Sequence, residues 1–382
     1  MKRIPLSVPN VCGNEQKYVD EALRDGWISS VGSYVNKFEE KVAEYAGVQE
    51  AVAVGSGTAG LHLAYKEAGV QSGDLVVVPT LTFIASVNPI RYQGAEPYFI
   101  DCDDTLCLDP KKLETFLENE CEYKEGIVIH TESGKVVRAV VVVHIFGNLA
   151  NMEALCTICH KYSLPLIEDA CEALGTKDST GKMAGTFGDY GVYSFNGNKI
   201  ISTGGGGIVV SNHEEHLKHI RFLSTQAKTD SWYFVHDEVG YNYRLTNISA
   251  AIGVGQLELL EGFITRKEQL YNLYRTKFEE VGLKMMDFRK DTRSNRWFFS
   301  LLWEKDYGMD RHQLMRELKE VGIETRPIWG LIHHQKPYQH CLHGDLAKSE
   351  YYIDRIVNIP CSTSLTDEEA LYVIQEIIQR KG

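Results

Sequence analysis

The fold of this chain is most constrained by short apolar segments that alternate with amphipathic helical patterns over its first two-thirds. Strands of a parallel sheet are covered on both faces, so they read as continuous apolar runs. The alternation therefore predicts an α/β fold whose large domain contains a mostly parallel, seven-stranded sheet. The predicted strands are Ala51–Val54, Leu75–Val78, Tyr98–Ile100, Ala139–His144, Leu164–Ile167, Gly191–Phe195 and Gly207–Val210.

The last third of the chain has a different pattern. Apolar residues recur at helical spacing from Thr246 to Glu280, which predicts one long helix or two abutting helices that bridge two domains. A chain of 382 residues is also long for a single core. We expect a large domain over residues 1–245, a bridging region over 246–280 and a small C-terminal α/β domain over 281–382. Within the small domain we predict a strand at Trp297–Trp303 and helices at Arg311–Val321 and Asp367–Gln379.

Three polar motifs follow predicted strands. They are Gly55–Thr58, Asp169 and Ser194–Lys199. In open α/β sheets, ligands bind beyond the carboxyl ends of the strands. The three motifs therefore indicate one site at one edge of the sheet.

The first motif, within Gly55–Gly60, is a glycine-rich turn that opens a helix. Free backbone amides and the positive end of a helix can hold a phosphate, although many such turns are only tight connections. The turn lacks both the Lys-Ser/Thr ending of a P-loop and the spacing of a dinucleotide fingerprint. This absence counts against a nicotinamide-dependent oxidoreductase.

The other two motifs supply an acid and an amine. Asp169 ends an apolar strand, where a carboxylate is costly without a cationic or proton-donating partner; the alternative is a cap for the following turn. Lys199 lies in a polar loop before Gly204–Gly207, and Ser194 adds a hydroxyl suited to phosphate. A carboxylate on a pyridinium nitrogen and an amine that forms a Schiff base are the groups that pyridoxal phosphate requires. Phe83 either stacks on such a ring or packs in the core.

Several longer segments resemble the DegT-type nucleotide-sugar aminotransferases, which are fold-type-I pyridoxal phosphate enzymes. The resemblance extends from Ile4 to the C-terminal helix. It implies this fold, with pyridoxal 5′-phosphate and its pyridoxamine form as the cofactor, and it places the chain among aminotransferases because related dehydratases carry histidine in place of Lys199. The segments are residues 56–61 (SGTAGL), 79–83 (PTLTF), 168–175 (EDACEALG), 193–199 (YSFNGNK) and 240–253 (GYNYRLTNISAAIG).

The resemblance also implies a role for each site residue. Lys199 is implied as the Schiff-base lysine and acid–base catalyst, Asp169 as the partner of the pyridine nitrogen and Phe83 as the stacking ring. Glu172 stands near the ring hydroxyl, where the family often has glutamine, so its role is open. Gly57, Thr58 and Ser194 are implied around the cofactor phosphate, and Asn242 is implied to reach the phosphate of the other subunit of a homodimer.

The segments 4–10 and 26–33 resemble aminotransferases of legionaminic-acid and bacillosamine-type pathways. This implies transfer of an amino group from L-glutamate to C4 of a UDP-linked 4-keto-6-deoxy-N-acetylhexosamine. The alternatives are a GDP- or dTDP-linked 3- or 4-ketosugar and, in another class, a non-catalytic regulatory protein that binds the cofactor. The presence of both Lys199 and Asp169 argues against a non-catalytic regulatory protein. Candidate sugar contacts are His334 and Tyr338, and Arg326 is a candidate for the diphosphate.

Charge and hydropathy limit the other partners. The 40 basic and 52 acidic side chains give a net charge of −12, which argues against nucleic acid and lipid surfaces. Because no apolar stretch approaches membrane-spanning length, we predict a cytoplasmic protein. We predict no metal site. His213, His216 and His219 are three residues apart, a step that turns each side chain by about 60° around a helix from the last, so they do not converge on one point. The group of His333, His334, His340 and His343 lacks the spacing of paired metal ligands.

Overall fold

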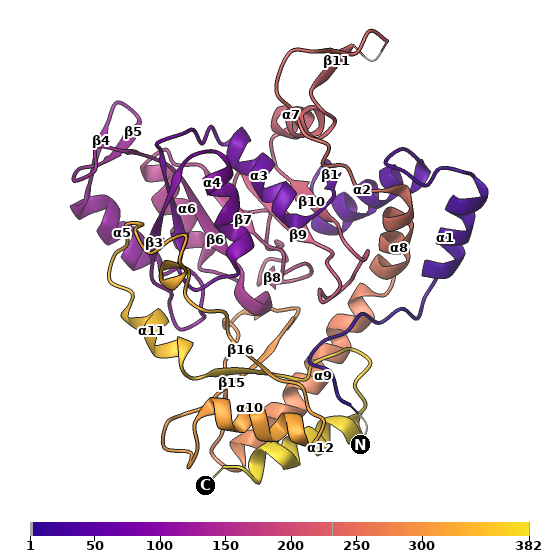
Figure 1. Cartoon of the computed structure of the whole chain (residues 1–382), viewed down its shortest axis with the longest axis vertical. Helices are drawn as coiled ribbons and strands as arrows, with labels where there is room; N and C mark the ends of the chain where they lie inside the picture. Colours follow the sequence, from indigo (N-terminus) through magenta and orange to yellow (C-terminus); the bar gives the residue numbers. More distant parts are fainter. Residues whose placement is uncertain (1–2, 231, 382) are drawn as a thin grey trace.

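A computed structural model describes residues 3–230 and 232–381. A nine-stranded sheet with helices on its faces forms the upper body of the molecule, and a four-stranded sheet lies below it (Figure 1). All seven predicted strands belong to the large sheet, in the order β1-β10-β9-β7-β6-β2-β3. Their bounds are β1 Ala51–Val54, β2 Leu75–Pro79, β3 Glu96–Ile100, β6 Val136–Val143, β7 Leu166–Asp169, β9 Tyr190–Ser194 and β10 Gly207–Val210.

The large sheet is more mixed than the sequence predicts. The pairs β9–β7, β7–β6, β6–β2 and β2–β3 are parallel, whereas β10 runs antiparallel to both β1 and β9. A hairpin of β4 (Cys121–Lys124) and β5 (Ile127–His130) adds two strands, with β5 antiparallel to β6. The sheet therefore has nine strands, not seven.

Both faces of the large sheet are buried. Neighbouring residues of β6 belong to opposite hydrophobic clusters, with Val140 and Val142 on one face and Ala139 and Val141 on the other, as strand geometry requires. The first face is covered by α2 (Ser33–Ala46), α5 (Pro110–Asn119) and α6 (Met152–Lys161). The second is covered by α3 (Gly57–Glu67), α4 (Asn88–Tyr92) and α7 (Glu214–Ser224).

The predicted bridging region forms two abutting helices, α8 (Asn247–Leu257) and α9 (Leu260–Glu279). Helix α8 packs against α1 (Glu15–Arg24) and α2, and α9 continues to the small sheet. Among the described residues, no single helix is long and apolar enough to cross a membrane. Only α8 and α9 taken together reach that length and composition, and they are bent by 57° at their break.

The small sheet has the antiparallel order β13-β15-β17-β16. The predicted strand and helices occur here as β15, α10 and α12, although β15 is shorter than expected. Residues near the N-terminus join this part, because Ile4 pairs with Ile323 and Leu6 O accepts a hydrogen bond from Cys361 N. The division at residues 245 and 280 stays a prediction. The elements are β13 Lys284–Met285, β15 Phe299–Leu302, α10 Arg311–Glu320, β16 Arg326–Pro327, α11 Ala347–Ile353, β17 Ile356–Ile359 and α12 Asp367–Ile378.

Short elements complete the chain. Strand β8 pairs with β14 and so joins the segment after β7 to the segment after α9. The hairpin β11–β12 projects away from the body (Figure 1). The bounds are β8 Lys177–Asp178, β11 Lys228–Asp230, β12 Val235–His236 and β14 Thr292–Arg293, with 3-10 turns η1 Ile84–Ser86, η2 Ile145–Gly147 and η3 Ile332–His334.

Candidate active site

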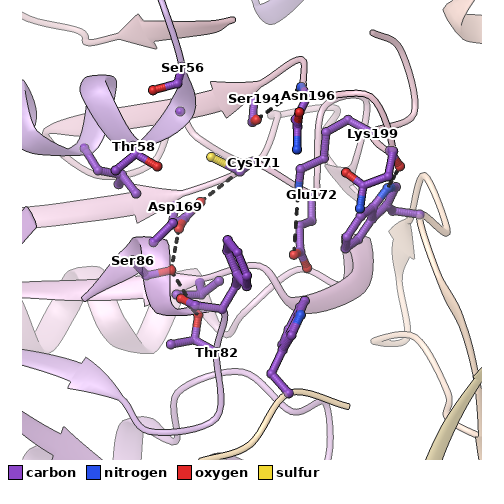
Figure 2. A pocket seen from close by; sticks show the side chains of 18 of the residues that line it. Ser56, Thr58, Thr82, Ser86, Asp169, Cys171, Glu172, Ser194, Asn196 and Lys199 are labelled. Carbon is purple, nitrogen blue, oxygen red and sulfur yellow. Dashed lines mark hydrogen bonds and ion pairs between the residues drawn. The ribbon is translucent and has the colours of Figure 1, made fainter. Parts of the chain in front are cut away.

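A cavity of about 320 Å³ opens at the carboxyl edge of the large sheet (Figure 2). Strands β6 and β7 end there in register, since Asp169 pairs with Val143, and β9, whose Val192 also pairs with Asp169, continues to Ser194. Residues from the C-terminal part close the other side, namely Trp297, Phe298 and Trp329. Seven residues proposed from the sequence line this cavity: Gly57, Thr58, Phe83, Asp169, Glu172, Ser194 and Lys199.

One end of the cavity is a cradle at the start of α3. Ser56 caps the helix, with its Oγ accepting a hydrogen bond from Ala59 N at 3.1 Å. A Cβ on Gly57 would lie 2.7 Å from Cys171 Sγ and 3.0 Å from Ser194 Cβ, so only glycine fits. The first turn of a helix leaves backbone amides without helical partners and carries a partial positive charge. Together with the Ser194 hydroxyl, this cradle fits a phosphate group.

A buried carboxylate lies at the centre of the cavity. Asp169 Oδ2 accepts a hydrogen bond from Ser86 Oγ at 2.6 Å, and Oδ1 accepts one from Cys171 N at 3.1 Å. The second bond is the capping contact that the sequence left as an alternative, but turns follow it rather than a helix. Both donors are neutral, so a cationic ring nitrogen would match the charge of Asp169. The donor set therefore fits a pyridinium ring.

Lys199 lies between an acid and an indole. Its Nζ is 3.6 Å from Glu172 Oε1 and 4.0 Å from the ring centroid of Trp297. Trp297 Nε1 donates a hydrogen bond to Asn198 O at 2.7 Å, which fixes the indole against the loop that carries the lysine. The side chain of Lys199 is only 12% exposed. The amine is thus held inside the cavity, as Schiff-base formation requires.

Glu172 is a buried acid of the site whose pKa is raised. Its Oε2 accepts a hydrogen bond from Phe146 N at 2.7 Å. Burial raises the pKa of Glu172 to about 7, against the opposing effects of the Lys199 amine and the Phe146 amide. Near neutral pH this carboxyl therefore exchanges a proton beside the lysine. The carboxyl of Glu172 lies beside the Lys199 amine, and its role stays open.

Phe83 belongs to the cavity wall and not to the core. The residue is 49% exposed, and its ring centroid is 6.0 Å from that of Trp329 at an interplanar angle of 50°. A core phenylalanine would be buried, so the exposed face is free to stack on a flat ring.

The remaining proposed residues do not line the cavity. Arg326 donates a hydrogen bond to Thr325 O, and His334 contacts Glu350. Tyr338 is buried, with its hydroxyl bonded to Asn88 Oδ1 at 2.5 Å. Their roles in binding the sugar stay predictions. Asn242 is exposed outside the cavity, and its predicted contact with another subunit is likewise untested.

Sequence reasoning missed Ser86, Cys171, Trp297 and Trp329, which all line the cavity. Ser86 and Cys171 stand three residues and two residues after proposed site residues, so proximity in sequence was the available signal. Trp297 and Trp329 come from the C-terminal part, and no local pattern connects them with Lys199.

An amine, a buried acid and a phosphate cradle in one cavity of an α/β sheet define a pyridoxal phosphate-dependent transferase of fold type I. Residues 10–378 match the profile of the DegT/DnrJ/EryC1/StrS aminotransferase family, and the chain belongs to that family. It is accordingly a pyridoxal phosphate-dependent sugar aminotransferase.

Relatives of known sequence match over nearly their whole length. The chain is 39% identical to EpsN of Bacillus subtilis (strain 168), covering 99% of this chain and 95% of EpsN. It is 37% identical to a GDP-perosamine synthase of Escherichia coli O157:H7, covering 99% and 98%. Among solved structures, a DegT DnrJ EryC1 StrS aminotransferase from Brucella abortus superposes with a TM-score of 0.88 at 26% identity, covering 97% and 95%.

Proposed function

We propose that this enzyme transfers an amino group from L-glutamate to C4 of a nucleotide-linked 4-keto-6-deoxy sugar. The arrangement that carries the proposal is Lys199 held beside Glu172, in the same cavity as Asp169 and the Gly57 cradle. The first candidate substrate is a UDP-linked 4-keto-6-deoxy-N-acetylhexosamine, on the resemblance of segments 4–10 and 26–33. A GDP-linked ketosugar is the second, because a GDP-perosamine synthase is 37% identical.

Pyridoxal phosphate, when bound, supplies a carbonyl that takes up the amino group and a ring that delocalises the electron pair left by proton loss. Asp169 would keep the ring nitrogen protonated. Lys199 would accept the proton from the substrate carbon that carries the amino nitrogen. It would then deliver that proton to the cofactor carbon on the other side of the same nitrogen. Glu172, 3.6 Å from the amine, would set the protonation state of Lys199 between these steps.

The aromatic lining of the cavity supports a deoxysugar. Phe83, Phe298 and Trp329 present aromatic side chains there. A 6-deoxy sugar carries a methyl group where other hexoses carry a hydroxymethyl group, and a methyl group packs favourably against an aromatic face. The oxidised C4 would then point toward Lys199.

Half-reactions provide the direct test. The pyridoxamine form of the enzyme is mixed with UDP-, GDP- and dTDP-linked 4-keto-6-deoxy sugars, and the return of the lysine-bound cofactor is followed by absorbance. We expect the UDP-linked N-acetylhexosamine to react fastest and NMR of the product to place nitrogen at C4. Faster reaction of the GDP-linked sugar would select the second candidate. No reaction with any of the three, or nitrogen at C3, would refute the proposal.

The predicted homodimer is tested by mixing two inactive variants. If Asn242 completes the site of the other subunit, a dimer of one Lys199→Ala chain and one Asn242→Ala chain contains one intact site. Random exchange of subunits should then restore about a quarter of wild-type activity. If Asn242 acts within its own chain, no intact site forms and the mixture stays inactive.

A further inference from the structure

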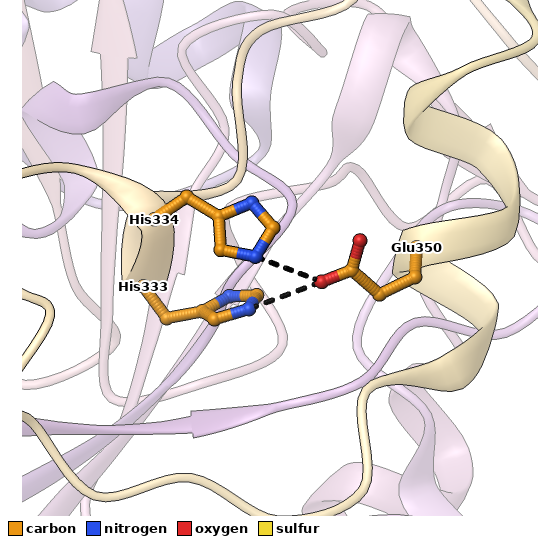
Figure 3. Close-up of side chains that lie close together, drawn as sticks. All are labelled: His333, His334 and Glu350. Atoms are coloured by element: carbon orange, nitrogen blue, oxygen red, sulfur yellow. Dashed lines mark ion pairs between the residues drawn. The ribbon is translucent and has the colours of Figure 1, made fainter.

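Three side chains that offer metal ligands converge outside the active-site cavity (Figure 3). His333 and His334 end the 3-10 turn η3, and Glu350 comes from helix α11. The two Nε2 atoms lie 3.2 Å and 3.0 Å from the same carboxylate oxygen, Oε1 of Glu350. One ligand atom from each residue lies within 4.8 Å of the other two.

We propose that His333, His334 and Glu350 form a binding site for a divalent transition-metal ion, with zinc as the representative ion. Tetrahedral zinc has bonds of about 2.0–2.2 Å to imidazole nitrogen and carboxylate oxygen, which separates neighbouring ligand atoms by about 3.4 Å. The observed nitrogen–oxygen separations are close to this value. Small side-chain rotations would admit the ion between the three atoms.

The side chain of His333 is oriented in advance by a buried neighbour. His333 Nδ1 lies 2.7 Å from the hydroxyl of Thr80, which is fully buried, and Ile332 N donates a hydrogen bond to Thr80 O at 3.0 Å. When the Nδ1–H of His333 donates to Thr80 Oγ1, which also accepts from His333 N, the Nε2 atom is unprotonated and is the ligand.

An ion can reach the site from solvent. The side chains of His334 and Glu350 are 56% and 43% exposed, whereas that of His333 is 11% exposed. Three protein ligands on a solvent-facing surface leave the fourth position to water. These histidines are not spaced along the chain as paired ligands are, which is why the sequence predicts no metal site. The third ligand comes from a helix that begins later in the chain, so spacing alone was an incomplete criterion.

The site adjoins the wall of the active site. Thr80, which contacts His333, belongs to the same segment as Phe83, and the segment before His333 carries Trp329. A bound ion would cross-link η3 to α11 behind these two aromatic residues. Binding should therefore raise the thermal stability of the holoenzyme, because the ion binds only the folded chain tightly.

The test uses untagged holoenzyme that has been dialysed against a chelator. Zinc is titrated against the protein and a chromophoric competitor, and cobalt is added separately to record its visible absorption. We expect one tight equivalent of zinc and a tetrahedral cobalt spectrum that zinc removes. Glu350→Gln and His334→Gln should each weaken zinc binding at least about tenfold, since each removes a ligand or its charge.

His340→Gln is the matched control, since His340 is an exposed histidine of the same segment outside the triad. It should bind zinc like the wild type. Absence of a stoichiometric equivalent in the wild type, or unchanged binding in both ligand variants, would overturn the proposal and leave Glu350 as a hydrogen-bond acceptor between two imidazoles. Should a variant fold poorly, as judged by loss of cofactor absorbance, the wild-type cobalt spectrum decides.

Discussion

The free energy of unfolding of the cofactor-free protein should fall as the pH rises toward 7, and replacing Glu172 by glutamine should remove this fall. The carboxyl of Glu172 is buried, and its pKa rises to about 7 in the folded chain. In the unfolded chain it returns to its ordinary value of 4.5. At a pH between these two pKa values, the Glu172 carboxyl is protonated in the folded chain and ionised in the unfolded chain. The group therefore contributes its full stability below pH 4.5 and loses it as the pH rises through about 7.

The size of the effect follows from the two pKa values. Each pKa unit corresponds to about 1.4 kcal/mol, so the rise from 4.5 to about 7 amounts to about 3 kcal/mol. Glutamine keeps nearly the shape of glutamic acid but does not titrate. We expect Glu172→Gln to match the wild type at low pH and to exceed it by about 3 kcal/mol in the free energy of unfolding at high pH.

Urea denaturation of both cofactor-free proteins between about pH 5 and pH 8 measures this difference. The cofactor is removed because its binding to the folded state would add a pH dependence of its own. Glu215→Gln serves as the control, since Glu215 is exposed and pairs with Lys218 at the surface. A wild-type minus Glu172→Gln difference that stays constant with pH would refute the raised pKa of Glu172.

Three further substitutions test the cavity. Gly57→Ala should weaken cofactor binding by at least about tenfold because its methyl group would collide with Cys171 and Ser194, whereas Gly197→Ala, with open space around it, should bind normally in a fluorescence titration. Ser86→Ala removes a hydrogen bond to the Asp169 carboxylate that is worth about 1.5–3 kcal/mol, so the free energy of unfolding of the cofactor-free protein should fall by about that amount in urea denaturation. Trp329→Ala should raise KM for the ketosugar by up to about tenfold with an unchanged glutamate half-reaction; an equal effect on both half-reactions would contradict its placement at the sugar.

The strands that sequence predicted correctly are those buried on both faces. Val76, Val141 and Ile208 are fully buried, and their apolar runs carry that information. The hairpin of β4 and β5 was missed because β4 is mostly exposed and polar, as Glu122–Lys124 show. The direction of β10 was also missed. Its residues, Gly207–Val210, are as apolar and as buried as those of the parallel strands, so composition does not reveal that the chain enters it from the opposite end.

The sequence predicted those site residues that stand at or just after the end of a strand. Asp169 and Ser194 end β7 and β9, and Gly57 starts the helix after β1, so topology alone brings them to one edge. Trp297 and Trp329 depend on how the C-terminal part packs on that edge, which is a tertiary property. For the same reason, sequence did not reveal that Glu350 lies beside His333 and His334.

Asp169 and Glu172 illustrate why environment, and not residue type, decides the role of an acid. The two carboxylates are three positions apart in the chain and line the same cavity. Asp169 accepts hydrogen bonds from two neutral donors, Ser86 Oγ and Cys171 N, so a cationic ring nitrogen would be its charged partner. Burial has the largest effect on the pKa of Glu172, and its cationic neighbour is the Lys199 amine, whose proton moves in each half-reaction of the proposed mechanism. An acid with a pKa of about 7 beside that amine can take up or release a proton when Lys199 does. An amide at position 172 does not titrate, so it would leave the lysine without this proton-exchanging partner. The Glu172→Gln enzyme should therefore differ from the wild type in the pH dependence of kcat more than in the affinity for cofactor.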